Sequence, residues 1–184
     1  MTLASSVDYL SMEGLPWVLM AWAGLYLLRP FATLVHELGH FWNAFILTTD
    51  SVILTVGKPD GNPMYQGKRV RIEFSFDKSF SGNTSYSDEG LGLFSKILII
   101  SGGPFFSLGM SCLTGWLTLS SVHPVWLEIT GVSWFCANSL TFIRAVLPMR
   151  LRPTEQFPHG PPSDGLQLLW LLSGKDEGGK REEN

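Results

Sequence analysis

The chain has 184 residues, of which 45% are hydrophobic and only 16% are charged, and its net charge is -3. This length corresponds to one domain, and the acidic balance without a basic cluster argues against a nucleic-acid partner. The hydrophobic residues are concentrated in long blocks separated by polar connections, which indicates a polytopic protein embedded in a lipid bilayer.

The first apolar block, residues 16–47, follows an N-terminal tail (1–14) that contains no Lys or Arg. Because a basic n-region is missing, no cleavable signal peptide is expected, and the block should serve as an uncleaved insertion signal. As a helix rising about 1.5 Å per residue it would be about 48 Å long, more than a bilayer core of about 30 Å requires. We therefore expect Pro30 to kink this helix or to begin a second helical piece.

Near the end of this block the chain reads HELGH, from His36 to His40. Histidines at positions i and i+4 lie on one face of a helix, where both imidazoles can bind one zinc ion. Glu37 is placed to act as general base on a zinc-bound water, as in metalloproteases. Ionisable side chains are costly at membrane depth and usually mark a functional site, so a pair of merely packing histidines is the weaker interpretation.

Residues 51–90 differ from the apolar blocks and predict a small β-sheet at the cytoplasmic surface of the membrane. Residues 52–56 are a β-favouring run, residues 70–76 alternate apolar and polar side chains, and residues 84–86 form a third short strand. The strand at 70–76 is either a solvated surface strand or one that pairs with an extended substrate.

Two further apolar blocks, residues 91–119 and 125–149, are long enough to cross a bilayer as helices. The first of them contains Gly102-Gly103-Pro104, which permits either a close approach of helices or a local break.

The last apolar stretch, residues 164–172, is too short to span, and it is expected to enter the membrane as a half-helix or to pack on the bundle before a polar tail, residues 174–184. The sequence thus predicts a mainly α-helical polytopic membrane protein with three transmembrane helices, a short fourth half-helix and a small sheet between the first and second blocks. These parts form a single domain, residues 1–184.

The charges of the loops predict the orientation in the membrane. The N-terminal segment and the loop at 120–124 contain no Lys or Arg, and the positive residues lie in the 51–90 region and after the third block: Lys58, Lys68, Arg69, Arg71, Lys78, Arg150 and Arg152. The positive-inside rule then places the N-terminus outside and the sheet in the cytoplasm. HELGH and Asp164 both come near the cytoplasmic face.

A catalytic zinc ion usually takes three protein ligands, so a third is needed beside the two histidines. Asp164 is the best candidate because it opens an apolar stretch at the same depth, and His159 is the alternative. Asp164 could equally be a helix N-cap, since an aspartate just before a helix accepts backbone hydrogen bonds. Spacing alone leaves ligand and cap open.

HELGH in a membrane helix, a later Gly-Gly-Pro and a downstream Ser-Asp-Gly together resemble the site-two protease family of intramembrane zinc metallopeptidases, in its compact, bacterial-type branch without a PDZ domain. The resemblance spans residues 30–172. It implies a zinc site of His36, His40 and Asp164, with Glu37 as general base. It departs from the common family pattern at Ser163, where a leucine is frequent, and at Ser107, where an asparagine is frequent.

The resemblance also implies the reaction, which is hydrolysis of peptide bonds in membrane-protein substrates within or near the bilayer. Asn138 matches the family's asparagine in the third block, and either Asn138 or a backbone N–H near Gly102 and Gly103 would stabilise the oxyanion. Two alternatives stay open: an inactive relative that binds a partner membrane protein, and a zinc-dependent membrane hydrolase with a non-peptide substrate. The oligomeric state and the identity of the substrate are not specified by the sequence.

Overall fold

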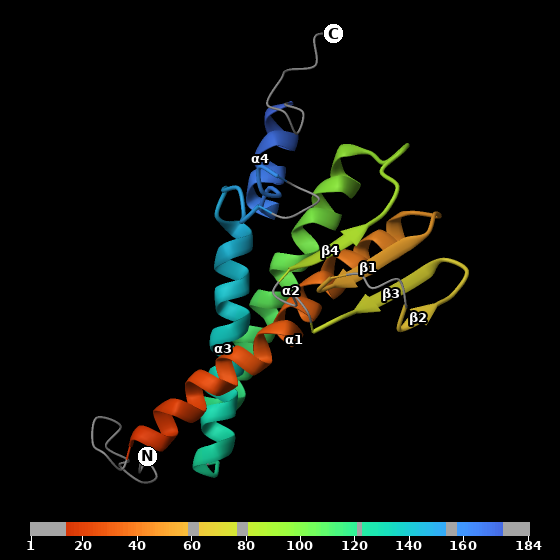
Figure 1. Ribbon diagram of the computed structural model, residues 1–184. Coiled ribbons are helices and arrows are strands. Elements are labelled where there is room, and N and C mark those ends of the chain that lie inside the picture. Colours follow the sequence, from red (N-terminus) through yellow and green to blue (C-terminus); the bar gives the residue numbers. More distant parts are fainter. Residues whose placement is uncertain (1–13, 59–62, 77–80, 121–122, 154–157, 175–184) are drawn as a thin grey trace.

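The computed structural model describes residues 14–58, 63–76, 81–120, 123–153 and 158–174. Within these residues the protein is mainly helical and carries one small sheet (Figure 1). The elements follow the chain as α1 (Leu15–Leu47), β1 (Val52–Val56), β2 (Tyr65–Gln66), β3 (Val70–Phe74), β4 (Gly82–Ser85), α2 (Leu93–Ser120), α3 (Val125–Val146) and α4 (Asp164–Ser173). All four predicted helical stretches are therefore helices.

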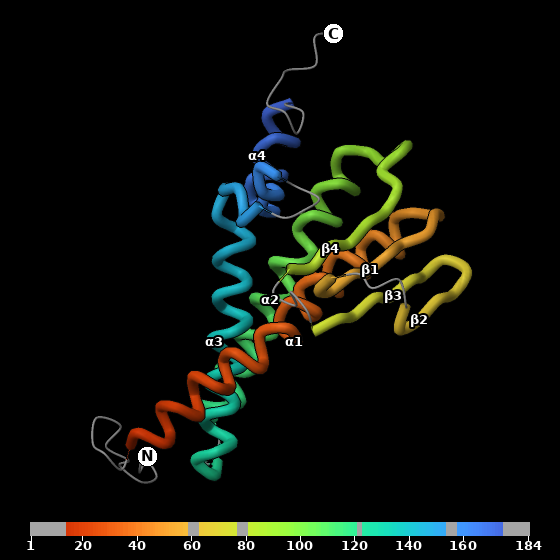
Figure 2. The backbone as a smooth tube through the Cα atoms, in the orientation of Figure 1, coloured from red at the N-terminus to blue at the C-terminus, as the bar shows by residue number. Residues whose placement is uncertain are grey.

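The three long helices pack on one another in pairs, and α4 packs against α2 and α3. The first half of α1 lies against α3, where Ser133 Oγ donates a hydrogen bond to the carbonyl of Ala21 (3.2 Å). The second half of α1 lies against α2 and against the sheet (Figures 1 and 2). The half of α1 that carries HELGH is thus the half covered by the rest of the molecule.

Both internal prolines are accommodated without ending a helix. α1 continues through Pro30 and α2 continues through Pro104. The expected second helical piece at Pro30 is therefore wrong, and Gly102-Gly103-Pro104 is not a break. A proline removes one backbone hydrogen bond, whereas ending a helix inside the bundle would leave several carbonyl and N–H groups unpaired.

Glycines let α1 and α2 approach to backbone contact. A Cβ atom added to Gly39 would collide with the carbonyl of Gly102, and one added to Gly102 would collide with the carbonyl of Gly39. Asn43 closes the contact by donating a hydrogen bond to the carbonyl of Leu98 (2.7 Å). Small residues at a helix crossing are the usual means of close packing in membrane bundles.

The sheet has the order β2-β3-β1-β4. β1 pairs with β3 in parallel and with β4 antiparallel, and β2 pairs antiparallel with β3. The strand predicted at 70–76 ends at Phe74, and the two-residue strand β2 was not predicted because it is too short to show a pattern. β3 lies inside the sheet, and β4 forms the edge.

The alternation in β3 is confirmed for the direction of the side chains but wrong for the exposure of Glu73. Val70, Ile72 and Phe74 are partly buried against the core, whereas Glu73 is buried although it lies on the opposite face. Arg71 donates to Glu73 Oε1 (Nε, 2.7 Å; Nη2, 2.6 Å) and thereby covers the carboxylate. Because Arg71 covers its carboxylate, Glu73 is buried although the alternating pattern predicts an exposed side chain.

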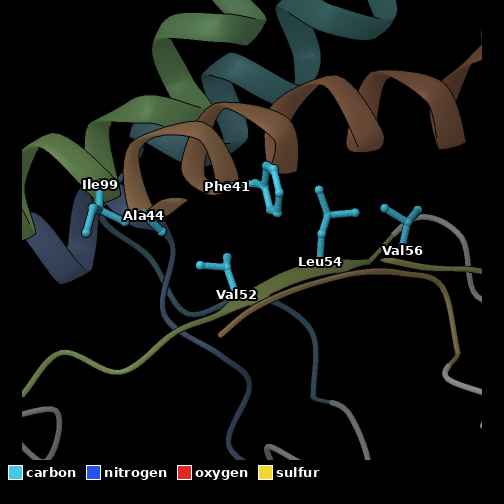
Figure 3. Close-up of a cluster of buried hydrophobic side chains, with 6 residues drawn as sticks. All are labelled: Phe41, Ala44, Val52, Leu54, Val56 and Ile99. Atoms are coloured by element: carbon cyan, nitrogen blue, oxygen red, sulfur yellow. The ribbon is translucent and has the colours of Figure 1, made fainter. Parts of the chain in front are cut away.

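The core joins one face of the sheet to α1. β1 alternates so that its apolar side chains face the helix, as Figure 3 shows. The fully or nearly fully buried cluster consists of Phe41 and Ala44 from α1, Val52, Leu54 and Val56 from β1, and Ile99 from α2. This packing holds the sheet beside the turn of α1 that carries HELGH.

Of the described helices, α1 and α2 are long and apolar enough to cross a membrane. The sequence predicted three such helices. α3 has 22 residues, which is sufficient length, but its hydroxyl and amide side chains make it more polar than α1 and α2.

Leu54→Ala should lower the free energy of unfolding by about 2–5 kcal/mol, because it leaves a cavity in a fully buried site. Chemical denaturation of the detergent-solubilised protein measures this loss. Ile46→Ala is the control, because Ile46 on α1 is 71% exposed and its truncation should change stability by less than about 0.5 kcal/mol. Equal losses in the two variants would contradict the packing of β1 on α1.

Candidate metal centre

His36 and His40 project from one face of α1 toward α4. Their Nε2 atoms lie 3.2 Å apart, and Asp164 Oδ2 lies 3.0 Å from Nε2 of His36 and 3.5 Å from Nε2 of His40. Both histidines are buried, and Asp164 is largely buried. Among the described residues these three form a group whose ligand atoms lie within 4.8 Å of one another and could hold a metal ion.

The start of α4 brings Asp164 to the histidines. Ser163 is the N-cap of α4, and its Oγ accepts a hydrogen bond from the N–H of Leu166 (3.2 Å). The hydroxyl of Ser163 also donates to the carbonyl of Leu147 (2.6 Å), which ties α4 to the end of α3. Ser163 rather than Asp164 caps the helix, so the N-cap interpretation of Asp164 is wrong, and its carboxylate lies beside the histidines. Its role as a metal ligand stays a prediction.

Each histidine is oriented by a hydrogen bond at its other ring nitrogen. Nδ1 of His40 lies 2.8 Å from the carbonyl of Ile99, and Nδ1 of His36 lies 3.1 Å from Ser107 Oγ. A carbonyl only accepts, so Nδ1 of His40 donates this hydrogen bond, and Nε2 is the ring nitrogen that could bind a metal. Such partners fix the ring and its tautomer in metal sites. The sequence pointed to Ser107 only as a departure from a pattern.

Gly103 provides the space in front of the two histidines. A Cβ atom added to Gly103 would collide with Nε2 of His40 and would lie 2.7 Å from Nε2 of His36. A zinc ion binds imidazole nitrogen at about 2.0–2.1 Å, so a Cβ atom would occupy the volume that an ion needs. Two imidazole nitrogens and one carboxylate oxygen are a set of donors that fits a transition-metal ion.

Glu37 points toward the sheet. Its carboxylate oxygen Oε2 accepts a hydrogen bond from the Thr84 hydroxyl of β4 (2.7 Å), and its side chain is buried. Tyr86, just after β4, is half-buried nearby; burial first, and the negative charges of Asp88 and Asp164 next, raise the pKa of its phenol. Neither Thr84 nor Tyr86 was predicted as a site residue from the sequence. Thr84 and Glu37 are 47 positions apart, and no local pattern relates residues at that separation.

The remaining predicted site residues have other surroundings. His159 is exposed and lies outside the three-residue group. Asn138 is fully buried in α3, where its Nδ2 donates to the carbonyl of Trp134 (3.0 Å) and its Oδ1 has no hydrogen-bond partner among the described residues. Gly102 and Gly103 lie inside α2, and the observed contacts give both a steric role. An oxyanion contact from any of these residues stays a prediction.

Gly103→Ala should weaken metal binding by at least about tenfold, because the new methyl group takes the space in front of both histidines. Metal content of the purified protein, measured by mass spectrometry after equilibration with limiting zinc, checks this. Gly109→Ala on the same helix is the matched control, since a Cβ atom there meets nothing within 4 Å. Wild-type zinc content in Gly103→Ala would contradict the placement of the ion.

If Asp164 is the third ligand, Asp164→Asn should likewise reduce zinc content by about tenfold or more, because it removes the anionic donor. His159→Asn should leave zinc content unchanged. The opposite pattern, full zinc in Asp164→Asn and loss in His159→Asn, would overturn Asp164 as the third ligand.

The chain was compared with protein-family models, curated proteins and solved structures. None of the three comparisons finds a match.

Proposed function

We propose that this protein is an intramembrane zinc endopeptidase of the site-two protease type. The observation that carries the proposal is the convergence of His36, His40 and Asp164 beside the buried carboxylate of Glu37. A set of three protein ligands, with no fourth in the group among the described residues, is typical of catalytic rather than structural zinc sites.

The residues divide the chemistry between them. A bound zinc ion would polarise the scissile carbonyl and acidify a water molecule. His36, His40 and Asp164 would hold the ion, and Ser107 and the Ile99 carbonyl fix the orientation of the imidazoles. Glu37 takes the proton from the attacking water and passes it to the leaving amine, so that the amide bond breaks with one proton transferred to nitrogen.

The edge of the sheet supports a peptide substrate. The N–H of Gly57 donates to the carbonyl of Ser81 (2.9 Å), so in the alternating antiparallel ladder the backbone groups of Gly82 and Thr84 point away from β1. No described strand pairs with that outer edge. A substrate added there would be extended, as hydrolysis requires, and would run past Glu37. Strand pairing is therefore proposed at β4 and no longer at residues 70–76.

The exposed side chains support a location in the bilayer. Trp22, Phe105 and Trp116 lie within α1 and α2 and are each about two-thirds exposed (69%, 69% and 66%). Large apolar side chains facing outward along long helices fit lipid better than water. We include α3 as a third span, with the N-terminus outside and the metal centre near the cytoplasmic face, as the loop charges predict.

Glu37→Gln should retain zinc but lower kcat for peptide cleavage by about 10²–10⁴-fold, because it removes the general base and keeps the ligands. Purified wild type and variant are compared in liposomes, with single-span membrane proteins as substrates and mass spectrometry of the products. Zinc removal by a chelator should abolish wild-type cleavage, and added zinc should restore it.

The control is Glu128→Gln, which changes a carboxylate at the other end of the bundle, in the first turn of α3. It should leave zinc content and cleavage at the wild-type level. Stoichiometric zinc in wild type with equal cleavage by wild type and Glu37→Gln would refute the protease assignment.

A further inference from the structure

The carboxylate of Glu37 is held by a side chain of the sheet. Thr84 Oγ1 lies 2.7 Å from Glu37 Oε2 and 3.2 Å from the backbone carbonyl of Glu37. The hydroxyl has one proton, and the shorter distance identifies the carboxylate oxygen as its main acceptor. A distance of 2.7 Å is the usual length of an O–H···O hydrogen bond.

Glu37 depends on this contact because it is only 6% exposed. A buried carboxylate is destabilised unless it is hydrogen-bonded. Among the described residues none forms a salt bridge with Glu37 and none donates a hydrogen bond to its Oε1. Thr84 is therefore the side chain that holds the base, and it engages one carboxylate oxygen while Oε1 stays available to a proton.

The strand period places a second residue of β4 against the same group. Side chains two apart on a strand share a face, so Gly82 and Thr84 both face α1. A Cβ atom added to Gly82 would lie 2.5 Å from Cγ and from Oε1 of Glu37. β4 therefore lies directly against the carboxylate, with the Thr84 hydroxyl at Oε2 and Gly82, which has no side chain, beside Oε1.

We propose that Thr84 is a positioning residue that orients Glu37 for catalysis, an inference that rests on the proposed peptidase function. The outer edge of β4 is also where the substrate peptide would pair. The backbone that would bind the peptide and the hydroxyl that orients Glu37 therefore belong to the same strand. Displacement of β4 would then misplace substrate and base together.

The test compares Thr84→Val, which removes the hydroxyl at nearly constant volume, with Thr84→Ser, which keeps it. With full-length protein and a single-span substrate, Thr84→Val should lower kcat by about 10- to 100-fold, with KM within about twofold and zinc content unchanged. Thr84→Ser should restore kcat to within about threefold of wild type. Ser85→Ala is the control, because Ser85 lies on the exposed face of the same strand; it should behave as wild type.

The outcomes separate this inference from the function on which it rests. Wild-type kcat in Thr84→Val, together with inactivity of Glu37→Gln, would overturn the role of Thr84 and leave the peptidase function intact. Equal losses in Thr84→Val and Thr84→Ser would also overturn it, because packing and not the hydroxyl would then matter. Zinc-loaded wild type that cleaves no peptide would remove both proposals. If Thr84→Val does not fold, Thr84→Ala provides the same loss of the hydroxyl and the same expected fall in kcat.

Discussion

The backbone contact between α1 and α2 is the constraint on which the arrangement of His36, His40 and Asp164 depends. Gly39 and Gly102 meet without side chains between them, and this closeness lets two groups of α2, the Ile99 carbonyl and the Ser107 hydroxyl, reach the histidines of α1. It also places Gly103 directly before both imidazoles. A side chain at the crossing would push the helices apart, and hydrogen bonds near 3 Å tolerate little displacement. Gly39, the glycine of HELGH, therefore has a structural role that differs from that of the polar residues of the motif.

One helical turn of α1 serves two parts of the molecule. The histidines face α2 and α4, where they meet Asp164, whereas Glu37 faces β4, where it meets Thr84. Successive residues of a helix point about 100° apart, so Glu37 can be held by the sheet while the histidines are held by helices. The apolar core between α1 and β1 keeps these two sides in a fixed relation. The packing of the sheet on α1 therefore affects both the histidines and Glu37.

Much of the fold follows from local patterns in the chain. Apolar length predicts the four helices, and β-branched runs predict β1, because these signals depend on residues close in sequence. The spacing of His36 and His40 likewise places both imidazoles on one helical face without any tertiary information. Local patterns do not report strand order, and they assigned Glu73 to solvent because the ion pair with Arg71 is not an apolar signal.

The sequence by itself therefore determined the two-histidine helix with its glutamate and the helical character of the chain. Only the tertiary structure decided that Ser163 caps α4 so that Asp164 can turn to the histidines, that β4 is the edge strand, and that Thr84 reaches Glu37. The physical reason is the separation of the residues along the sequence. Helix and strand periods arise from neighbours in the chain, whereas these contacts join segments many residues apart. They exist because helix crossing and sheet packing bring those segments together.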